Sequence, residues 1–374
     1  MMTHGGDGSS TANIKFLNVL GRFFVYNENM VRHAELDNKT WHRLGRLLRK
    51  GKSIPAEIKT APELASVFEK PCENPGTTDD PGLRNLILQV SQACNLRCRY
   101  CGADFGRYGG DFKMMSSATA ERAIDLLFDT SPSSELAITY FGGEPLLNLL
   151  TVIASARHAL KRAKKEGRNL SLHLVTNGVL LKPETLFRLD ELGFSLTVSI
   201  DGPKGCHDLL RPSHDGSGSY RTITRSLEIA RKLPIGQRIT VRGTFTRQTA
   251  AFFPNVRFLA EKGFSRNIAY EPVFLPLSHP LSLRWQDMQT VKQAYSDLAR
   301  YYVKQWMRGE PFCLWDIDDA ITQLVKATPR KSRCGSGVTT VAVTADEDIF
   351  ACHMSTGMAD ACLGDLQRGL DEKR

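Results

Sequence analysis

The strongest constraint on the fold is a regular alternation that begins near residue 83 and continues almost to residue 310. Apolar, strand-like runs occur at 83–91, 135–141, 170–176, 194–200, 238–245 and 267–274. Stretches of helical periodicity follow them, near 117–129, 148–166, 183–192, 220–232, 252–262 and 286–308. Such alternation predicts a parallel sheet with right-handed crossover helices. It fits a partial barrel or an open doubly wound sheet, and periodicity does not choose between them.

Unusual motifs come directly after four of these strands. A loop with three cysteines follows the first strand, GGEP (142–145) the second, TNG (176–178) the third and SIDGP (199–203) the fourth. Barrels and open α/β sheets both bind ligands at the carboxyl ends of parallel strands. The motifs are therefore expected to converge on one site, although TNG and SIDGP also have the composition of ordinary turns.

The three cysteines, Cys94, Cys98 and Cys101, lie within the octapeptide CNLRCRYC. Thiolates suit zinc, copper and iron–sulfur clusters. A structural zinc site needs four ligands, and the nearest other cysteine, Cys72, lies in a linker-like stretch upstream. A cubane cluster has four irons, normally with one cysteine each. Three cysteines would leave its fourth iron open to a small ligand.

Composition divides the rest of the chain. Residues 1–13 are polar and rich in Gly and Ser, and we expect a disordered tail there. Residues 14–50 predict a small α+β unit, 51–82 a linker containing Pro and Gly, 83–309 the β-α domain, and 310–374 a separate C-terminal region.

The 14–50 unit has its own local signals. The run from Ile14 to Leu36 predicts a hairpin that turns at YNENM (26–30). Asp37 is a candidate N-cap for a helix over 38–50.

Bulk properties exclude several classes of protein. Of the 374 residues, 41% are apolar and 24% are charged, which is ordinary for a globular protein in water. No run approaches the roughly 18 apolar residues of a membrane span, and the polar start lacks a secretory signal, so a cytoplasmic location is expected. The net charge is +9, but the Lys and Arg residues are dispersed and form no basic–aromatic nucleic-acid module. We therefore expect neither a nucleic acid nor a membrane as partner.

Taken together, the motifs resemble those of the radical S-adenosylmethionine (radical SAM) enzymes. CNLRCRYC matches their CxxxCxxC signature, and YFGGEP (140–145) resembles their GGE motif. The six β-α units resemble their partial (β/α)6 barrel, and SIDGPKGCHDLLR (199–211) resembles the peptide-modifying branch. The predicted hairpin between Cys334 and Cys352, followed by LGDL (363–366), resembles the start of the SPASM/twitch extension of that branch.

The resemblance implies a [4Fe–4S] cluster on Cys94, Cys98 and Cys101, with an open iron that binds SAM. Reductive cleavage of SAM would give a 5′-deoxyadenosyl radical that abstracts a hydrogen atom from the substrate. The residues implied in SAM binding are Gly142, Gly143, Glu144, Pro145, Asn177, Ser199, Asp201, Tyr100 and either Arg211 or Arg221. Glycine and carboxylate would meet the ammonium group, and an arginine fork fits the SAM carboxylate. No catalytic acid or base is assigned; His207 and Asp208 are interpreted as a local hydrogen-bonded pair.

An auxiliary iron–sulfur cluster is also implied, with Cys334 and Cys352 as ligands and Cys362 as a third candidate. The chain departs from the SPASM pattern here, because the further cysteine-rich stretch that usually follows is absent from this sequence. At most one incomplete cluster is therefore expected in this region.

For the substrate, the resemblance implies a ribosomally made precursor peptide that receives a thioether, cyclophane or ether cross-link. The 14–50 unit resembles part of a leader-peptide recognition fold, which binds a leader as an added β-strand. A flavodoxin-like or ferredoxin-like protein is the implied electron donor. Three alternatives stay open: a maturase that oxidises a protein Cys or Ser, a radical SAM enzyme acting on a small molecule, and a non-catalytic iron–sulfur or zinc protein.

Overall fold

The computed structural model describes residues 14–19, 22–27, 32–49, scattered positions between 54 and 67, 82–326 and 334–371. The expected tail at 1–13, Cys72 and the turn at 28–31 lie outside these residues. The chain divides into two compact units. The first comprises 1–80 and 317–333, and the second comprises 81–316 and 334–374.

The first unit contains an antiparallel sheet and one helix. Its strands, in the order β1-β2-β3, are β1 (Ile14–Val19), β2 (Arg22–Asn27) and β3 (Arg32–Leu36), and the helix is α1 (Asn38–Arg49). The sequence predicted a two-stranded hairpin, whereas the register pairs Val19 with Arg22, so the first half of that run is itself a hairpin. The predicted cap is confirmed, because Asp37 Oδ1 accepts a hydrogen bond from the Thr40 amide at 2.9 Å.

Packing in this unit is apolar. Val25 of β2, Leu36 of β3 and Leu44 of α1 share a core cluster, and Phe23 stacks on Trp41 with ring centroids 4.7 Å apart. The helix thus covers one face of the small sheet. Strands β1 and β3 form the two edges of that sheet.

The second unit contains the predicted parallel strands. They are β4 (Asn85–Ser91), β5 (Glu135–Gly142), β6 (Asn169–Thr176), β7 (Ser195–Ser199), β8 (Ile239–Phe245) and β9 (Asn267–Pro272). Each pairs in parallel with the next along the chain. All six expected strands are therefore confirmed.

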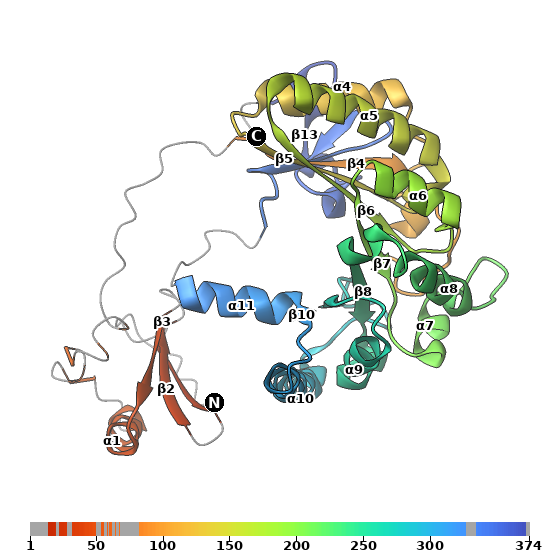
Figure 1. Ribbon diagram of the computed structural model, residues 1–374. Helices are drawn as coiled ribbons and strands as arrows, with labels where there is room; N and C mark the ends of the chain where they lie inside the picture. The colour runs from red at the N-terminus through yellow and green to blue at the C-terminus, as the bar shows by residue number, and fades with distance from the viewer. Residues whose placement is uncertain are drawn as a thin grey trace. The chain divides into compact units, whose positions relative to one another are not determined.

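The expected helices are confirmed as well. They are α4 (Ser117–Thr130), α5 (Leu149–Glu166), α6 (Pro183–Glu191), α8 (Tyr220–Ala230), α9 (Phe253–Lys262) and α10 (Met288–Met307). A short helix that the periodicity did not predict, α7 (Lys204–Leu210), follows β7. Strand order never reverses from β4 to β9, so right-handed crossovers put the helices on one face of the sheet (Figure 1). This is barrel-type winding rather than the doubly wound alternative.

The two faces of this sheet differ in chemistry, as β8 illustrates. Ile239, Val241 and Phe245 are buried under the helices. Arg242 and Thr244, which point to the opposite face, are only partly buried. The face away from the helices is therefore the one that polar ligands can use.

The C-terminal strands continue the same sheet. They are β11 (Thr340–Val343), β12 (Asp348–Phe350), β13 (Cys362–Asp365) and β14 (Gly369–Leu370), while β10 (Cys313–Leu314) extends the other edge beside β9. The predicted β11–β12 hairpin is confirmed. Its placement was not predictable, because β11 pairs in parallel with β4, roughly 250 residues earlier. This region also contains the helix α11 (Trp315–Lys326).

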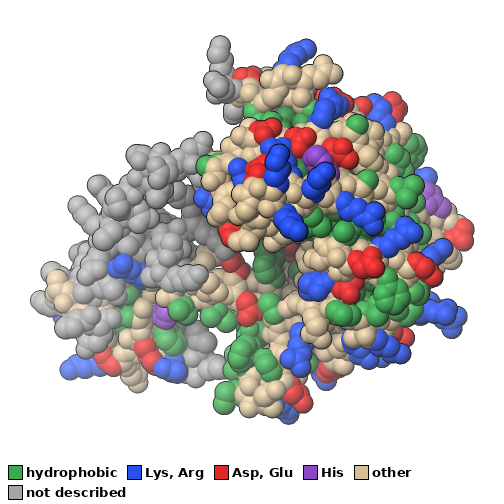
Figure 2. Space-filling view, turned by 45° about the horizontal axis from the view of Figure 1, so that its top comes forward, with side chains coloured by type: hydrophobic (Ala, Val, Ile, Leu, Met, Phe, Trp, Pro, Cys, Tyr) green, Lys and Arg blue, Asp and Glu red, His purple; other side chains and the backbone are tan. Residues whose placement is uncertain are grey.

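Surface features agree with the composition. On the face seen in Figure 2, Lys and Arg side chains are interspersed with Asp and Glu. None of the helices in the described parts of the chain is both long and apolar enough to cross a bilayer.

Candidate functional site

The cysteine loop follows β4 and is held by backbone hydrogen bonds to a segment far along the chain. The amide of Arg97 donates to the carbonyl of Pro212 and that of Arg99 to the carbonyl of Leu210, both at 2.8 Å. The side chains of Arg97 and Arg99 are exposed, whereas Tyr100 between the second and third cysteines is buried. The loop thus has a charged outer side and an inner side that faces the sheet.

The three thiols of this loop share one environment. Burial raises the pKa of Cys94 to about 11 and that of Cys98 to about 12, and the nearby thiol of Cys101 adds to both shifts. Backbone amides point at two of the sulfurs: Leu96 N lies 3.4 Å from Cys94 Sγ, and Phe105 N lies 3.2 Å from Cys101 Sγ. The thiols of Cys94 and Cys98 therefore keep their protons at neutral pH until a metal displaces them.

The GGE turn after β5 packs directly on this loop. A Cβ atom at Gly142 (φ 137°) would lie 2.2 Å from the carbonyl oxygen of Ser91, and one at Gly143 would lie 2.2 Å from that of Ala93. The glycines are needed because two backbones meet here. Pro145 is buried and opens the short helical turn that follows.

Glu144 is fully buried at the end of this turn. Its carboxylate accepts hydrogen bonds from the Thr176 hydroxyl and the Asn177 amide, both at 2.7 Å, and from the Leu146 amide at 3.0 Å. All three donors are neutral, and no salt bridge to Glu144 occurs among the described residues. Burial therefore dominates and raises the pKa of Glu144 to about 7.

Asn177 connects this carboxylate to the cysteine loop. Its backbone amide donates to the Glu144 carboxylate, while its side-chain nitrogen Nδ2 lies 2.7 Å from Asn95 Oδ1 and 3.7 Å from Cys94 Sγ. The first three strand-end motifs therefore meet at one place, as their positions predicted.

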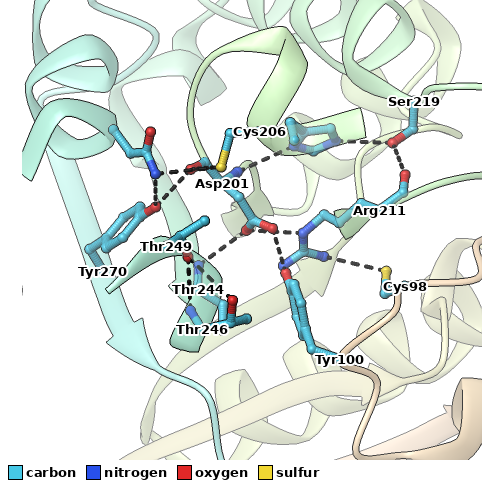
Figure 3. A network of polar contacts seen from close by, with 12 residues as sticks. Cys98, Tyr100, Asp201, Cys206, Arg211, Ser219, Thr244, Thr246, Thr249 and Tyr270 are labelled. Carbon is cyan, nitrogen blue, oxygen red and sulfur yellow. Dashed lines mark hydrogen bonds and ion pairs between the residues drawn. The ribbon is translucent and has the colours of Figure 1, made fainter. Parts of the chain in front are cut away.

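A second buried carboxylate, Asp201, follows β7 and is the centre of the network in Figure 3. One oxygen accepts from Arg211 Nε and from the Thr244 amide, both at 3.1 Å, and the other accepts from the Tyr100 hydroxyl at 2.7 Å. Its backbone carbonyl accepts from the Tyr270 hydroxyl at 2.7 Å. Both oxygens of the carboxylate thus have hydrogen-bond partners within the protein.

Arg211 connects this network to the cysteine loop. Its guanidinium lies over the Tyr100 ring, 5.2 Å from the centroid, and its Nη1 lies 4.0 Å from Cys98 Sγ. The charges of Asp201, Tyr100 and Cys98 keep the pKa of Arg211 above its ordinary value in spite of burial. A permanent cation therefore lies beside the second cysteine.

His207 and Asp208 do not bond to each other. His207 Nδ1 lies 3.2 Å from the Asp201 amide and Nε2 lies 3.0 Å from Ser219 Oγ, whereas Asp208 pairs with Lys204. Burial lowers the pKa of His207 to about 4, so the ring is neutral at physiological pH. Sequence reasoning missed Tyr270 and Thr244, because no local motif marks them.

Two further predicted residues lie apart from these contacts. Ser199 is partly buried at the end of β7, and Arg221 is exposed in the first turn of α8. Of the two candidate arginines, only Arg211 lies at the cysteines.

The C-terminal cysteines differ in exposure. Cys334 is exposed, while Cys352 and Cys362 are partly buried. Cys352 precedes His353, whose ring contacts that of Phe141 at 4.3 Å and whose carbonyl accepts from Gln89 Nε2 at 3.3 Å. This segment therefore lies on the polar face of the sheet beside β4 and β5.

Residues 88–249 match the radical SAM superfamily. The chain contains a radical SAM domain. The matched segment includes the cysteine loop, the GGE turn, Asn177 and the Asp201–Arg211 network.

Relatives and solved structures agree with this domain. The chain is 24% identical over 280 residues to the cysteine-type anaerobic sulfatase-maturating enzyme of Clostridium novyi, covering 72% of this chain and 73% of that protein. It spans 52% to 73% of the length of three curated relatives.

Two solved structures share its fold. Native anSMEcpe with bound AdoMet and the Kp18Cys peptide has a TM-score of 0.66 at 21% identity, covering 76% of this chain and 78% of that chain. Streptococcus suis SuiB bound to precursor peptide SuiA has a TM-score of 0.58 at 14% identity, covering 96% and 88%.

Radical SAM enzymes use a [4Fe–4S] cluster and SAM. The described residues fit both. Cys94, Cys98 and Cys101 are free thiols on one loop. No set of three His, Cys, Asp or Glu side chains in the described ranges is spaced for a single metal ion. A cubane cluster has a different requirement, because each of its irons is bound by its own thiolate.

Proposed function

We propose that Cys94, Cys98 and Cys101 bind the cluster of this radical SAM enzyme and that Glu144 binds the SAM ammonium group. When bound, the cluster and SAM together supply a 5′-deoxyadenosyl radical that abstracts hydrogen from substrate. The protein's part is to bind and orient these groups in a site from which water is excluded.

The observation that carries the proposal is the chemistry of Glu144. A fully buried carboxylate with three neutral donors and no described cation is an electrostatically incomplete site. A ligand ammonium would complete it, and Asn177 ties that carboxylate to Cys94. Gly142 and Gly143 support the same site by letting the turn approach the cysteine loop.

Arg211 is the stronger candidate for the SAM carboxylate, because it is a buried cation beside Cys98 and Arg221 is exposed. We further propose contacts from Ser199 to the polar part of SAM. Asp201 and Tyr100 are proposed to act mainly by positioning Arg211, since their polar groups bond to each other and to it.

The proposal is tested by reconstituting the full chain anaerobically with iron and sulfide, adding dithionite and SAM, and measuring 5′-deoxyadenosine by mass spectrometry. Replacing the three loop cysteines together with Ala should abolish the product. Cys206→Ala is the matched control, because this thiol lies on α7 and bonds to Asn255. A triple variant that still cleaves SAM contradicts the proposal. Iron well above four per chain, lost on Cys352→Ala, would support an auxiliary cluster on Cys334, Cys352 and Cys362.

For the substrate we propose a precursor peptide whose leader binds the 14–50 unit as an extra strand. The support is the three-stranded sheet, in which β1 and β3 are the edge strands. SuiB, whose fold this chain shares, is bound to a precursor peptide. The chemistry proposed is a cross-link on that peptide.

Hydrogen exchange tests the leader proposal. Adding the peptide encoded beside the gene should slow amide exchange in β1 or β3, and β2, which is already paired on both sides, should not change. Unchanged exchange in both edge strands contradicts leader binding there and leaves the SAM chemistry intact.

A second candidate is oxidation of a Cys or Ser on a protein to formylglycine. The similarity over 280 residues to a sulfatase-maturating enzyme favours it. Incubation with synthetic Cys-containing and Ser-containing sulfatase peptides, followed by an aldehyde-specific label, distinguishes it from cross-linking, which leaves no aldehyde.

For the electron donor we propose an acidic flavodoxin-like or ferredoxin-like protein that docks on the exposed Arg97 and Arg99. Replacing both with Glu should slow SAM cleavage with flavodoxin and leave the dithionite-driven rate unchanged. An equal loss with both reductants contradicts this docking surface.

A further inference from the structure

Tyr108 lies in a strained turn just after the third cysteine. Asp104, Phe105 and Tyr108 all have left-handed backbone conformations, with φ of 46°, 56° and 54°. Non-glycine residues seldom adopt this region, and such strain tends to collect at functional sites. The Tyr108 amide donates to the carbonyl of Ala103 at 3.0 Å, which fixes the turn.

The hydroxyl of Tyr108 is buried and has no hydrogen-bond partner among the described residues. Buried hydroxyl groups without a partner are rare, because they forfeit their bonds to water. Burial raises the pKa of Tyr108, and the charges of Cys101, Cys352 and Cys94 add to this, in that order. The phenol therefore stays protonated, and three sulfurs are within electrostatic reach of it.

The turn after β12 holds Tyr108 from the other side. A Cβ atom at Gly357, whose φ is 83°, would lie 2.4 Å from the Tyr108 carbonyl oxygen. The neighbouring Thr356 accepts a hydrogen bond from Gln89 Nε2 of β4 at 2.9 Å. The backbone of Tyr108 thus contacts both the cysteine loop and the segment that follows Cys352.

We propose that Tyr108 donates a hydrogen bond to the iron-bound sulfur of Cys101 and thereby raises the reduction potential of the cluster. This rests on the proposed function. A thiolate bound to iron is a better acceptor than a thiol, so the hydroxyl gains its partner only when the cluster is present. Hydrogen bonds to the sulfurs are one of the means by which a protein sets the potential of a cluster.

The test is a redox titration of the reconstituted full chain without SAM, followed by electron paramagnetic resonance. Tyr108→Phe should lower the ratio of reduced to oxidised cluster about tenfold at a fixed potential, which is about 59 mV for one electron. Tyr140→Phe is the control, because its hydroxyl bonds to Ser155 Oγ at 3.1 Å on the helix side. An unchanged midpoint in Tyr108→Phe overturns the proposal.

Two further measurements decide the remaining cases. In the iron-free chain, Tyr108→Phe should leave the Tm unchanged or higher, since it removes an unpaired hydroxyl; a lower Tm would reveal a protein partner and overturn the proposal. In a Cys352→Ala background the shift should persist, and its loss would move the acceptor to Cys352 and overturn the assignment to Cys101. A native chain that binds no iron would instead contradict the proposed function.

Discussion

The turns after β5 and β7 each bury one carboxylate, and the two are balanced differently. Asp201 has a guanidinium, a phenol and a backbone amide around its oxygens. Glu144 has two amides and a hydroxyl, all neutral. Both carboxylates are completely buried.

The two carboxylates differ in whether a described cation neutralises them. The charge of Asp201 is neutralised by Arg211, so the turn after β7 is electrostatically complete without any ligand. The charge of Glu144 is not neutralised by any described residue, and burial of this unpaired charge raises the pKa of Glu144 to about 7. The carboxylate after β7 holds its neighbouring side chains in place, whereas we propose that the carboxylate after β5 binds the cation of a ligand.

The largest expected effect comes from removing the carboxylate that is paired. Asp201→Asn leaves the buried Arg211 without its counter-ion, and we expect a loss of roughly 3–5 kcal/mol in the free energy of unfolding. Chemical denaturation of the iron-free chain measures it. The double variant Asp201→Asn with Arg211→Met should recover part of the loss, and no recovery would show that the ion pair is not its cause.

Removing the unpaired carboxylate should act in the opposite direction on stability and should depend on pH. The pKa of Glu144 is about 7 in the folded chain and near 4.3 when unfolded. Between these two pH values the folded state binds more protons than the unfolded state. The contribution of Glu144 protonation to the free energy of unfolding is therefore complete below about pH 4.3 and is lost as pH rises through 7.

Relative to Glu144→Gln, the native chain should therefore lose roughly 3 kcal/mol of its free energy of unfolding between pH 5 and pH 8.

His207 is predicted to have the opposite pH dependence of stability, because its pKa of about 4 in the folded chain lies below the unfolded value. Its contribution is lost as pH falls from about 6.5 to 4. Denaturation midpoints of the native, Glu144→Gln and His207→Gln chains across this range check both signs. Parallel curves for the native and Glu144→Gln chains would refute the first.

Glu144→Gln should also weaken SAM binding. Loss of a buried charge partner costs about 3 kcal/mol, or roughly a hundredfold in Kd. Calorimetry with the reconstituted chain measures this, and native affinity should rise as pH increases from 6 to 8 while that of the variant stays flat. Equal affinity of both chains would mean that Glu144 does not meet the ammonium.

The smallest expected effect sharpens the role of the GGE turn. Gly143→Ala places a methyl group against the Ala93 carbonyl and should cost about 2 kcal/mol in the free energy of unfolding, with reduced iron loading. Gly205→Ala in α7 is the matched control, since its Cβ would meet nothing within 4 Å. The control should be neutral or slightly stabilising.

Much of the site could be predicted, because each motif is local and the topology of parallel strands brings their ends together. The cysteine loop, the GGE turn and Asn177 meet as their positions after successive strands required. What spacing could not give is which carboxylate keeps its charge unpaired. That depends on Arg211, which lies ten residues beyond Asp201 and returns to it only after α7.

Other features were beyond local signals altogether. The β11–β12 hairpin was visible in the sequence, but its parallel pairing with β4 was not. Tyr270 and Thr244 carry no motif. The β7–β8 register brings Thr244 to Asp201, and the β8–β9 register brings Tyr270 there.

The sequence by itself determined the six β-α units, the three-thiol loop and the edge of the sheet where the motifs gather, because periodicity and strand order are properties of the chain. Tertiary structure alone decided the roles of the two buried carboxylates and brought the segment after Cys352 against Tyr108. Those outcomes depend on burial and on neighbours distant in sequence, which set the cost of an unpaired charge or hydroxyl.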